Sequence, residues 1–104
     1  MSKHVIKIKK GTNEYVIQAG WDRPFSQHYL VIFDEANEVE PLVYSNMADD
    51  KAFNTGVEFS YFENILLNFG LTLPKQMIDE ILQDKEQDIG NKFVEHESIT
   101  LSDS

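Results

Sequence analysis

The chain has 104 residues, with 18 acidic and 9 basic side chains and a formal net charge of −9. This length fits one domain, because two domains of half the length would each be too small to bury a good core. The absence of cysteine excludes a disulfide framework, a thiolate zinc site and a cysteine nucleophile.

The negative charge is unevenly distributed along the chain. Four of the nine bases lie in the first ten residues, and from residue 11 onward 5 bases stand against 18 acids, a difference of −13. Such a surface repels phosphate backbones, so we expect no direct nucleic-acid binding. No apolar run is long enough for a membrane span, and the basic start alternates charged and apolar residues, unlike a signal peptide. We therefore expect a cytoplasmic protein without membrane contact.

Two-residue periodicity predicts strands at the start of the chain. In residues 3–10, His4, Ile6 and Ile8 share one face and lysines dominate the other. The lysines favour an edge strand, because charge there discourages pairing with other chains. A short turn and a second alternating run at 14–21 predict an antiparallel hairpin.

Two further strands are expected before the pattern changes. The run at 28–33 is apolar on both faces and rich in β-branched and aromatic residues, which predicts a central strand. Residues 41–45 predict a short fourth strand that begins at Pro41, where a missing N–H costs little. Residues 46–57 are predicted to form a surface loop with a short turn or a role of its own.

Helical periodicity follows from about residue 57. Ser60 and Glu63 have the S-x-x-E spacing of a capping box, and Gly70 stands where a left-handed residue ends a helix. The apolar stripe of this helix consists of Phe62, Ile65, Leu66 and Phe69. A second helix is predicted from Pro74, with Gly90 as its stop. Its apolar stripe consists of Leu73, Met77, Ile78, Ile81 and Leu82.

These elements predict an α+β fold in which a four-stranded antiparallel meander carries a two-helix hairpin on one face. Residues 92–96 are ambiguous and could add a short C-terminal strand. We expect a single domain over 1–97 and a flexible tail over 98–104. The second face of the sheet is also apolar, and three covers remain open: the tail, the 46–57 loop, or a second copy that forms a homodimer through the sheet.

The predicted connection between the second and third strands is the first candidate binding site. Trp21, Arg23 and Phe25 give it the composition of an interface anchor. The Arg23 guanidinium beside aromatic rings could clamp a carboxylate or a phosphate. The alternative is local: Trp21 and Phe25 close the core, Asp22 accepts backbone hydrogen bonds in the turn, and Arg23 pairs with an acid.

The second predicted helix is the other candidate. We interpret Asp79, Glu80, Asp84 and Asp88 as outward acids that form one strip. This strip is either an ordinary solvated face, or a surface that meets a basic partner or imitates a run of phosphates. Exchange of Glu80, Asp84 and Asp88 for lysine should leave folding intact, and if partner capture also survives, the strip has no role in binding.

Motifs for catalysis and for metal binding are absent from the sequence. His4, His28 and His96 are the only good transition-metal ligands, and no two have a close spacing. The chain has no nucleophile elbow, EF-hand loop or phosphate-cradling glycine loop. We therefore assign no catalytic residue, no metal site and no cofactor.

The sequence favours a small acidic, non-enzymatic module for protein interaction or regulation. Its partner would be another protein, with a basic surface if the acidic strip makes the contact. Two alternatives stay open. One is an acidic inhibitor that mimics nucleic acid in a basic groove, and the other is a small enzyme with a site between Arg23, His28 and the acids Asp49 and Asp50.

Overall fold

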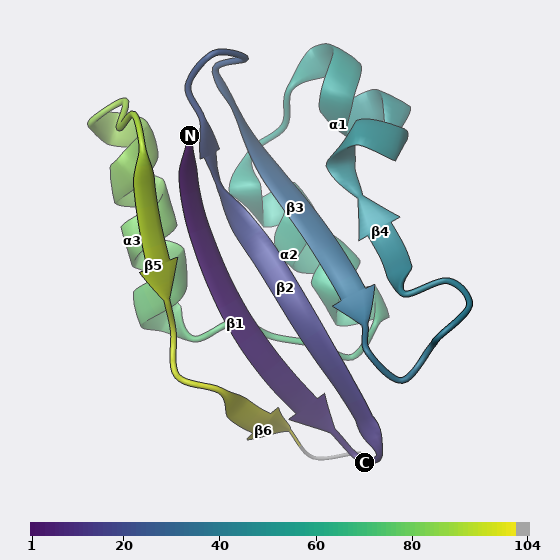
Figure 1. Ribbon diagram of the computed structural model, residues 1–104. Coiled ribbons are helices and arrows are strands. Elements are labelled where there is room, and N and C mark those ends of the chain that lie inside the picture. Colours follow the sequence, from purple (N-terminus) through teal and green to yellow (C-terminus); the bar gives the residue numbers. More distant parts are fainter. Residues whose placement is uncertain (102–104) are drawn as a thin grey trace.

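The computed structural model describes residues 1–101 as a sheet with helices on one side (Figure 1). The elements in chain order are β1 (Ser2–Lys10), β2 (Asn13–Asp22), β3 (Gln27–Asp34), β4 (Leu42–Ser45), the 3-10 helix η1 (Asn46–Ala48), α1 (Asp50–Thr55), α2 (Phe59–Asn68), α3 (Lys75–Glu86), β5 (Lys92–Glu95) and β6 (Ile99–Leu101). None of the helices in this part of the chain is both long enough and apolar enough to cross a membrane.

The sheet is mixed, with the strand order β4-β3-β2-β1-β5 and with β6 also paired to β1. The predicted meander is present, since β1 to β4 are antiparallel neighbours. The expectation that β1 lies at an edge is wrong, because its residues 2–5 pair in parallel with β5 and its residues 8–10 with β6. The α+β class is confirmed, and the sheet is wider than four strands.

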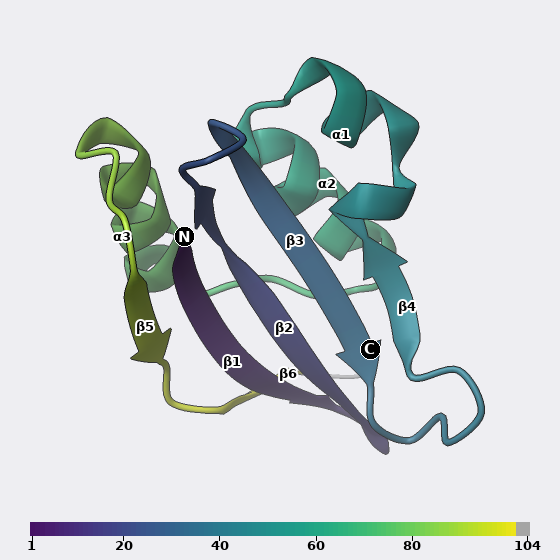
Figure 2. The ribbon, with the colours of Figure 1, turned by 45° about the horizontal axis from the view of Figure 1, so that its top comes forward.

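Strand register sorts the side chains onto two faces. The pairs Ile6↔Ile17 and Ile17↔Ile32 align three isoleucines across β1, β2 and β3, all at most 1% exposed. We call this side the covered face, because α2 and α3 pack on it; Figure 2 shows both helices behind the sheet. Its residues include His4, Ile6, Ile8, Tyr15, Ile17, Ala19, Leu30 and Ile32. The other side, which we call the open face, includes Lys3, Val5, Lys7, Lys9, Val16, Gln18, Val31 and Phe33.

The helix α2 begins earlier than the capping-box pattern predicts. Its first residue is Phe59 and its N-cap is Glu58, whose side chain makes no capping hydrogen bond. Burial decides this start, because Phe59 is 1% exposed and its ring packs 6.1 Å from that of Phe62. The predicted left-handed end is confirmed by Gly70, with φ of +74°.

The helix α3 ends before the predicted stop at Gly90. It runs to Glu86, and Asp88 then adopts a left-handed φ of +47°. This turn is fixed by tertiary contacts, since the Trp21 Nε1–H donates to Asp88 Oδ1 at 2.9 Å. The contact between Trp21 and Asp88 therefore ends α3 a few residues before Gly90, the end that the sequence predicts.

The segment predicted as a loop at 46–57 contains η1 and α1. Asp49 precedes α1 and its Oδ1 accepts from the backbone N–H of Ala52 at 3.4 Å. Asp49 Oδ2 accepts from the hydroxyls of Tyr44 at 2.7 Å and Tyr61 at 2.8 Å. The hydrogen bond from Tyr44, with help from Tyr61, holds the pKa of Asp49 below its ordinary value. The two tyrosines thus anchor α1 to β4 and α2.

The predicted boundary at residue 97 does not mark the end of the sheet. Ser98 is followed by β6, whose Ile99 and Leu101 are half-buried against the core cluster. The remaining residues of the predicted tail, 102–104, lie outside the described part of the chain.

Candidate functional site

The predicted binding loop between β2 and β3 is divided between core and surface. Trp21 is only 7% exposed and is tied to Asp88 by its indole N–H. Asp22 Oδ1 accepts from the backbone N–H of Phe25 at 3.3 Å, an ordinary turn contact. Arg23 Nε lies 3.3 Å from Asp88 Oδ2, and because both side chains are exposed the pair adds little stability. Arg23 and Phe25 are therefore the exposed side chains of the predicted anchor, while Trp21 belongs to the core.

The four acids expected to form one outward strip occupy different environments. Asp79 is exposed and pairs with Lys75 at 2.9 Å, while Glu80 is half-buried. Asp84 is 1% exposed, so the expectation that it points outward is wrong. Asp88 lies beyond the end of α3 and accepts the hydrogen bond described above.

Helical spacing explains the inward direction of Asp84. It follows Met77 by seven residues and Ile81 by three, and this spacing places all three on the face that packs against the sheet. A carboxylate on such a face is tolerated only where donors reach it. The covered face of β1 and the neighbouring β5 supply them.

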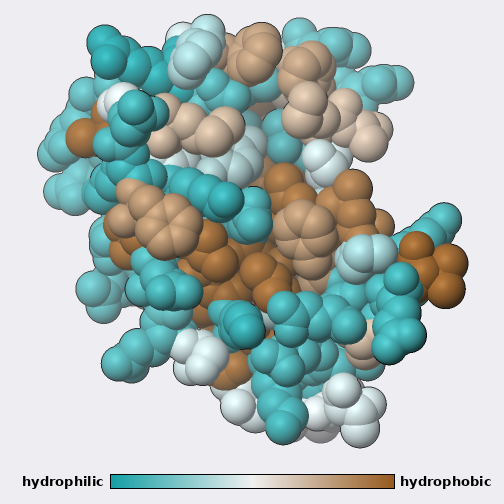
Figure 3. Space-filling view, viewed as in Figure 1, coloured by the Kyte–Doolittle hydropathy of each residue, from teal (hydrophilic) through white to brown (hydrophobic). Residues whose placement is uncertain are grey.

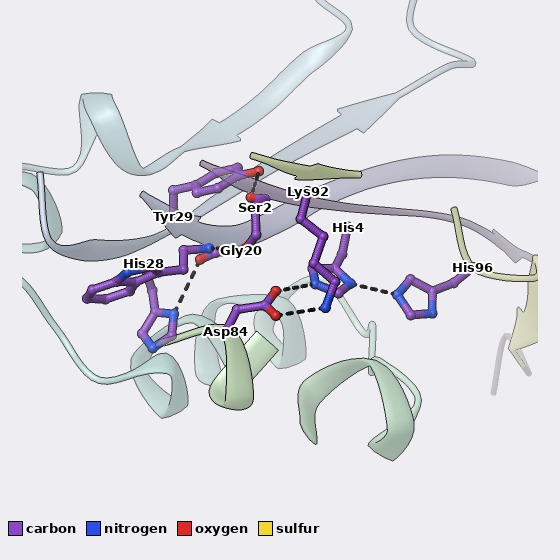
Figure 4. A network of polar contacts seen from close by, with 9 residues as sticks. Ser2, His4, Gly20, His28, Tyr29, Asp84, Lys92 and His96 are labelled. Carbon is purple, nitrogen blue, oxygen red and sulfur yellow. Dashed lines mark hydrogen bonds and ion pairs between the residues drawn. The ribbon is translucent and has the colours of Figure 1, made fainter. Parts of the chain in front are cut away.

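A polar cluster surrounds Asp84 between α3 and the start of β1 (Figure 4). The His4 Nε2–H donates to Asp84 Oδ2 at 2.7 Å, and Lys92 Nζ donates to Oδ1 at 2.9 Å. Ser2 also donates to this carboxylate, while its Oγ accepts from the backbone N–H of Trp21 at 2.9 Å. Burial alone raises the pKa of Asp84, but the hydrogen bonds from His4, Lys92 and Ser2 outweigh it and hold the pKa below its ordinary value.

The second nitrogen of His4 continues the cluster toward the surface. His4 Nδ1 lies 2.9 Å from His96 Nε2, and Figure 4 shows the His4 ring between Asp84 and the His96 ring. The backbone N–H of His96 donates to Val5 O at 2.9 Å, which fixes this residue beside β1. One ligand atom from each of His4, Glu80 and His96 lies within 4.8 Å of the other two.

The hydrogen-bond partners of His4 determine which of its ring nitrogens carries a hydrogen. An ionised carboxylate only accepts, so the hydrogen of the bond between His4 and Asp84 lies on His4 Nε2. The pKa of His96 is lowered by burial and by electrostatic interaction with His4 and Lys92, against an opposing effect of Glu80. The 2.9 Å contact between His4 Nδ1 and His96 Nε2 is a hydrogen bond, so one of these nitrogens donates and the other accepts, and both lie on the side of the cluster near Glu80.

His28 is a separate buried histidine. Its Nδ1–H donates to Gly20 O at 3.3 Å, and the rings of Trp21 and Phe59 pack around it. Within residues 1–101 its Nε2 is the one buried side-chain polar atom without a partner. Burial lowers the pKa of His28, with the positive charge of Lys85 acting in the same direction. This ring is thus held neutral.

The residues of the predicted small enzyme site are engaged in separate contacts. Arg23 pairs with Asp88, and Asp49 caps α1 between two tyrosines. The pocket beside His28 has a volume of about 250 Å³, and Arg23, Asp49 and Asp50 are not among its lining residues. The residues that line it with His28 are Trp21, Ser26, Gln27, Gly56, Val57, Glu58 and Lys85. The charged side chains beside His28 in this pocket are instead Glu58 and Lys85.

The open face combines apolar and basic side chains. Cross-strand pairing aligns Lys7, Val16 and Phe33 in one row, and Val5, Gln18 and Val31 in the next. All three valines are half-buried. Figure 3 shows a continuous apolar band across the middle of this face, bordered by hydrophilic surface. Phe93 pairs with Lys3 on the same side and is 63% exposed.

A groove of about 210 Å³ opens at one end of this apolar band. Its apolar lining consists of Met1, Phe25, Tyr29, Val31, Met47 and Phe53. Phe25 and Met47 are 62% and 70% exposed, and the Phe25 ring packs 5.8 Å from that of Phe53. The segment expected as a loop therefore covers one corner of the open face and leaves its centre uncovered within residues 1–101.

Sequence reasoning finds some of these groups and misses their arrangement. Period two places His4 on the buried face of β1, and the spacing from Met77 and Ile81 would have turned Asp84 inward. The parallel pairing that brings His96 beside His4 has no local signal, because 92 positions separate the two residues.

Comparison with protein-family models, curated sequences and solved structures finds no match to this chain.

Proposed function

We propose that the protein is a non-enzymatic interaction module that binds another protein through the open face of its sheet. The observation that carries this proposal is the apolar band of Val5, Val16 and Val31, which continues into the groove at Phe25 and Met47. Contiguous apolar surface rimmed by polar groups is typical of interaction sites. Aromatic and methionine side chains, which line the groove, are enriched at such sites.

Charge indicates the chemistry of the partner. The chain has a net charge of −9, yet Lys3, Lys7 and Lys9 point from β1 toward the open face. Lys3 Nζ lies 5.9 Å from the ring centroid of Phe93, so a basic group already borders the apolar surface. A partner with apolar side chains at its centre and carboxylates toward β1 complements this face. A basic partner would instead need the acids of α3, and Asp84 is buried there.

Affinity capture from lysate of the native cell, followed by mapping with the purified partner, tests this proposal. Val16→Glu and Lys7→Glu alter the open face. The matched controls Leu82→Glu and Lys75→Glu make the same chemical changes on the outer side of α3, where Leu82 is 41% exposed. We expect one partner that is captured by the wild type and by both controls and is lost with both open-face variants.

The second step uses the purified partner. Binding must shift the NMR methyl signals of Val16 and Val31, and moderate salt should weaken it, because the lysine contacts are exposed and screened. Equal capture by all variants, or shifts confined to α3, would contradict the proposal. Sedimentation of the purified chain is the remaining check. A stable dimer that Val16→Glu disrupts would assign the open face to a second copy of the chain and contradict the proposal that a different protein binds there.

A further inference from the structure

We propose that His4, Glu80 and His96 form a binding site for one divalent transition-metal ion, with zinc as the best fit. The three side chains come from β1, α3 and the segment after β5, and their ligand atoms lie within 4.8 Å of one another. This site lies at the covered side of the sheet and is distinct from the open face.

The distances suit a shared ion. Two nitrogens bound to one tetrahedral zinc ion, each about 2.0–2.1 Å from the metal, lie about 3.3 Å apart. His4 Nδ1 and His96 Nε2 are 2.9 Å apart, so a small outward movement of His96 opens the site. His96 is only half-buried, which permits that movement, and its backbone bond to Val5 keeps it beside β1.

Asp84 orients the His4 ring so that its Nδ1 faces the proposed metal position. A histidine that binds a metal with one nitrogen usually donates its other ring N–H to a carboxylate, which fixes tautomer and orientation. His4 makes this contact, with Nε2–H donating to Asp84 Oδ2 at 2.7 Å while Nδ1 faces His96. Asp84 is in turn held by Lys92 at 2.9 Å. The buried half of the cluster therefore orients His4 Nδ1 as a ligand.

Charge and ligand type favour zinc. Lys92 offsets the charge of Asp84, so Glu80 supplies the excess negative charge that a divalent ion needs. Two imidazoles and one carboxylate are ligands that zinc accepts, and a set of three leaves one position for water or a further ligand. Glu80 and His96 are both half-exposed, so this position opens toward solvent.

Titration of the full chain with zinc chloride, followed by calorimetry, tests the proposal. We expect one ion per chain in the wild type. His96→Gln and Glu80→Gln each remove a ligand at a half-exposed position, where folding is least at risk, and we expect both to lose this binding. The matched controls are Glu97→Gln and Asp79→Asn, exposed neighbours outside the cluster, which should bind as the wild type does.

Asp84→Asn separates orientation from ligation. It keeps an oxygen acceptor for the His4 N–H and removes the charge, and loss of such a carboxylate partner typically weakens metal affinity about 10–100-fold. Cobalt(II) gives an independent readout, because a four-coordinate site produces strong visible absorption that zinc cannot show. We expect these bands in the wild type and in Glu97→Gln, and their loss in His96→Gln.

Two results would overturn the site. One is the absence of stoichiometric zinc binding by the folded wild type. The other is equal binding by the wild type, His96→Gln and Glu80→Gln, which would leave the cluster as a hydrogen-bond network only. Circular dichroism of every variant verifies that lost binding is not lost folding.

Discussion

The covered and open faces of the same strands have different physical roles. On β2, Ile17 faces the helices and is fully buried, whereas its neighbour Val16 faces the other way and is half-buried. Polar groups differ as well, since His4 on the covered face has a partner at both ring nitrogens, while the lysines of β1 extend from the open face. This contrast indicates that the covered face contributes most of the stability, and our proposal assigns recognition to the open face.

Removal of the Asp84 carboxylate should cause the largest loss in the free energy of unfolding among these variants. Asp84→Ala leaves the buried His4 N–H without an acceptor, and loss of one member of a buried ionic pair costs about 3–5 kcal/mol. Asp79→Ala on the same helix is the control, with an expected change within about 0.5 kcal/mol because that residue is exposed. Urea unfolding of the two variants measures the difference. Similar values for both would mean that the cluster adds no stability.

Two neighbours on β2 compare the faces directly. Ile17→Ala opens a cavity in the core and should cost about 3 kcal/mol. Val16→Ala trims a side chain that is already half in water, so we expect less than about 1 kcal/mol. Equal losses in chemical denaturation would show that the open face is packed like the covered one, which is the signature of a second copy or partner already bound there.

Gly20 on β2 packs closely against the backbone of Ser2 at the start of β1. A Cβ at this position would lie 2.2 Å from the backbone carbonyl oxygen of Ser2, which also accepts from the Tyr29 hydroxyl at 2.8 Å. Gly20→Ala should therefore displace the N-terminal strand and cost about 1–3 kcal/mol. At Gly90 the nearest atom to an added Cβ is an Arg23 nitrogen at 3.5 Å, so Gly90→Ala should be tolerated. Thermal unfolding of this pair checks the prediction.

His28 predicts a smaller, pH-dependent effect. Because burial lowers its pKa in the folded state, the unfolded chain binds more protons as the pH falls below about 6.5, and acid reduces stability. His28→Phe keeps an aromatic ring at this position and removes the titratable imidazole. The free energy of unfolding should then depend less steeply on pH between about 7.5 and 5.5. His96 contributes with the same sign and should leave a residual slope. An unchanged slope in the variant would contradict the assignment.

Local periodicity predicts much of the fold. The hairpin of β1 and β2, the central place of β3 and the left-handed end of α2 at Gly70 all follow from patterns within a few residues. The capping box at Ser60 fails because burial of Phe59 outweighs a cap contribution of about 1 kcal/mol. The sequence does not predict the helix α1, although Asp49 is a good N-cap, because six residues show little periodicity.

Long-range pairing accounts for what the sequence does not predict. The lysines of β1 favour an edge position in the sequence, but they point out of the open face, and β5 and β6 pair with β1 along that edge. The same parallel pairing brings His96 and Lys92 to His4. His4 and His96 give no metal motif in the sequence, because they lie side by side only after β5 has docked on β1.

Histidine nitrogen NMR during zinc titration tests the central claim most directly, that Asp84 orients His4 as a metal ligand at the rim of the covered face. The account predicts large shifts at His4 Nδ1 and at one nitrogen of His96, a retained proton on His4 Nε2, and unchanged signals from His28 and Val16. Shifts centred on His28, or loss of the His4 Nε2 proton, would contradict it.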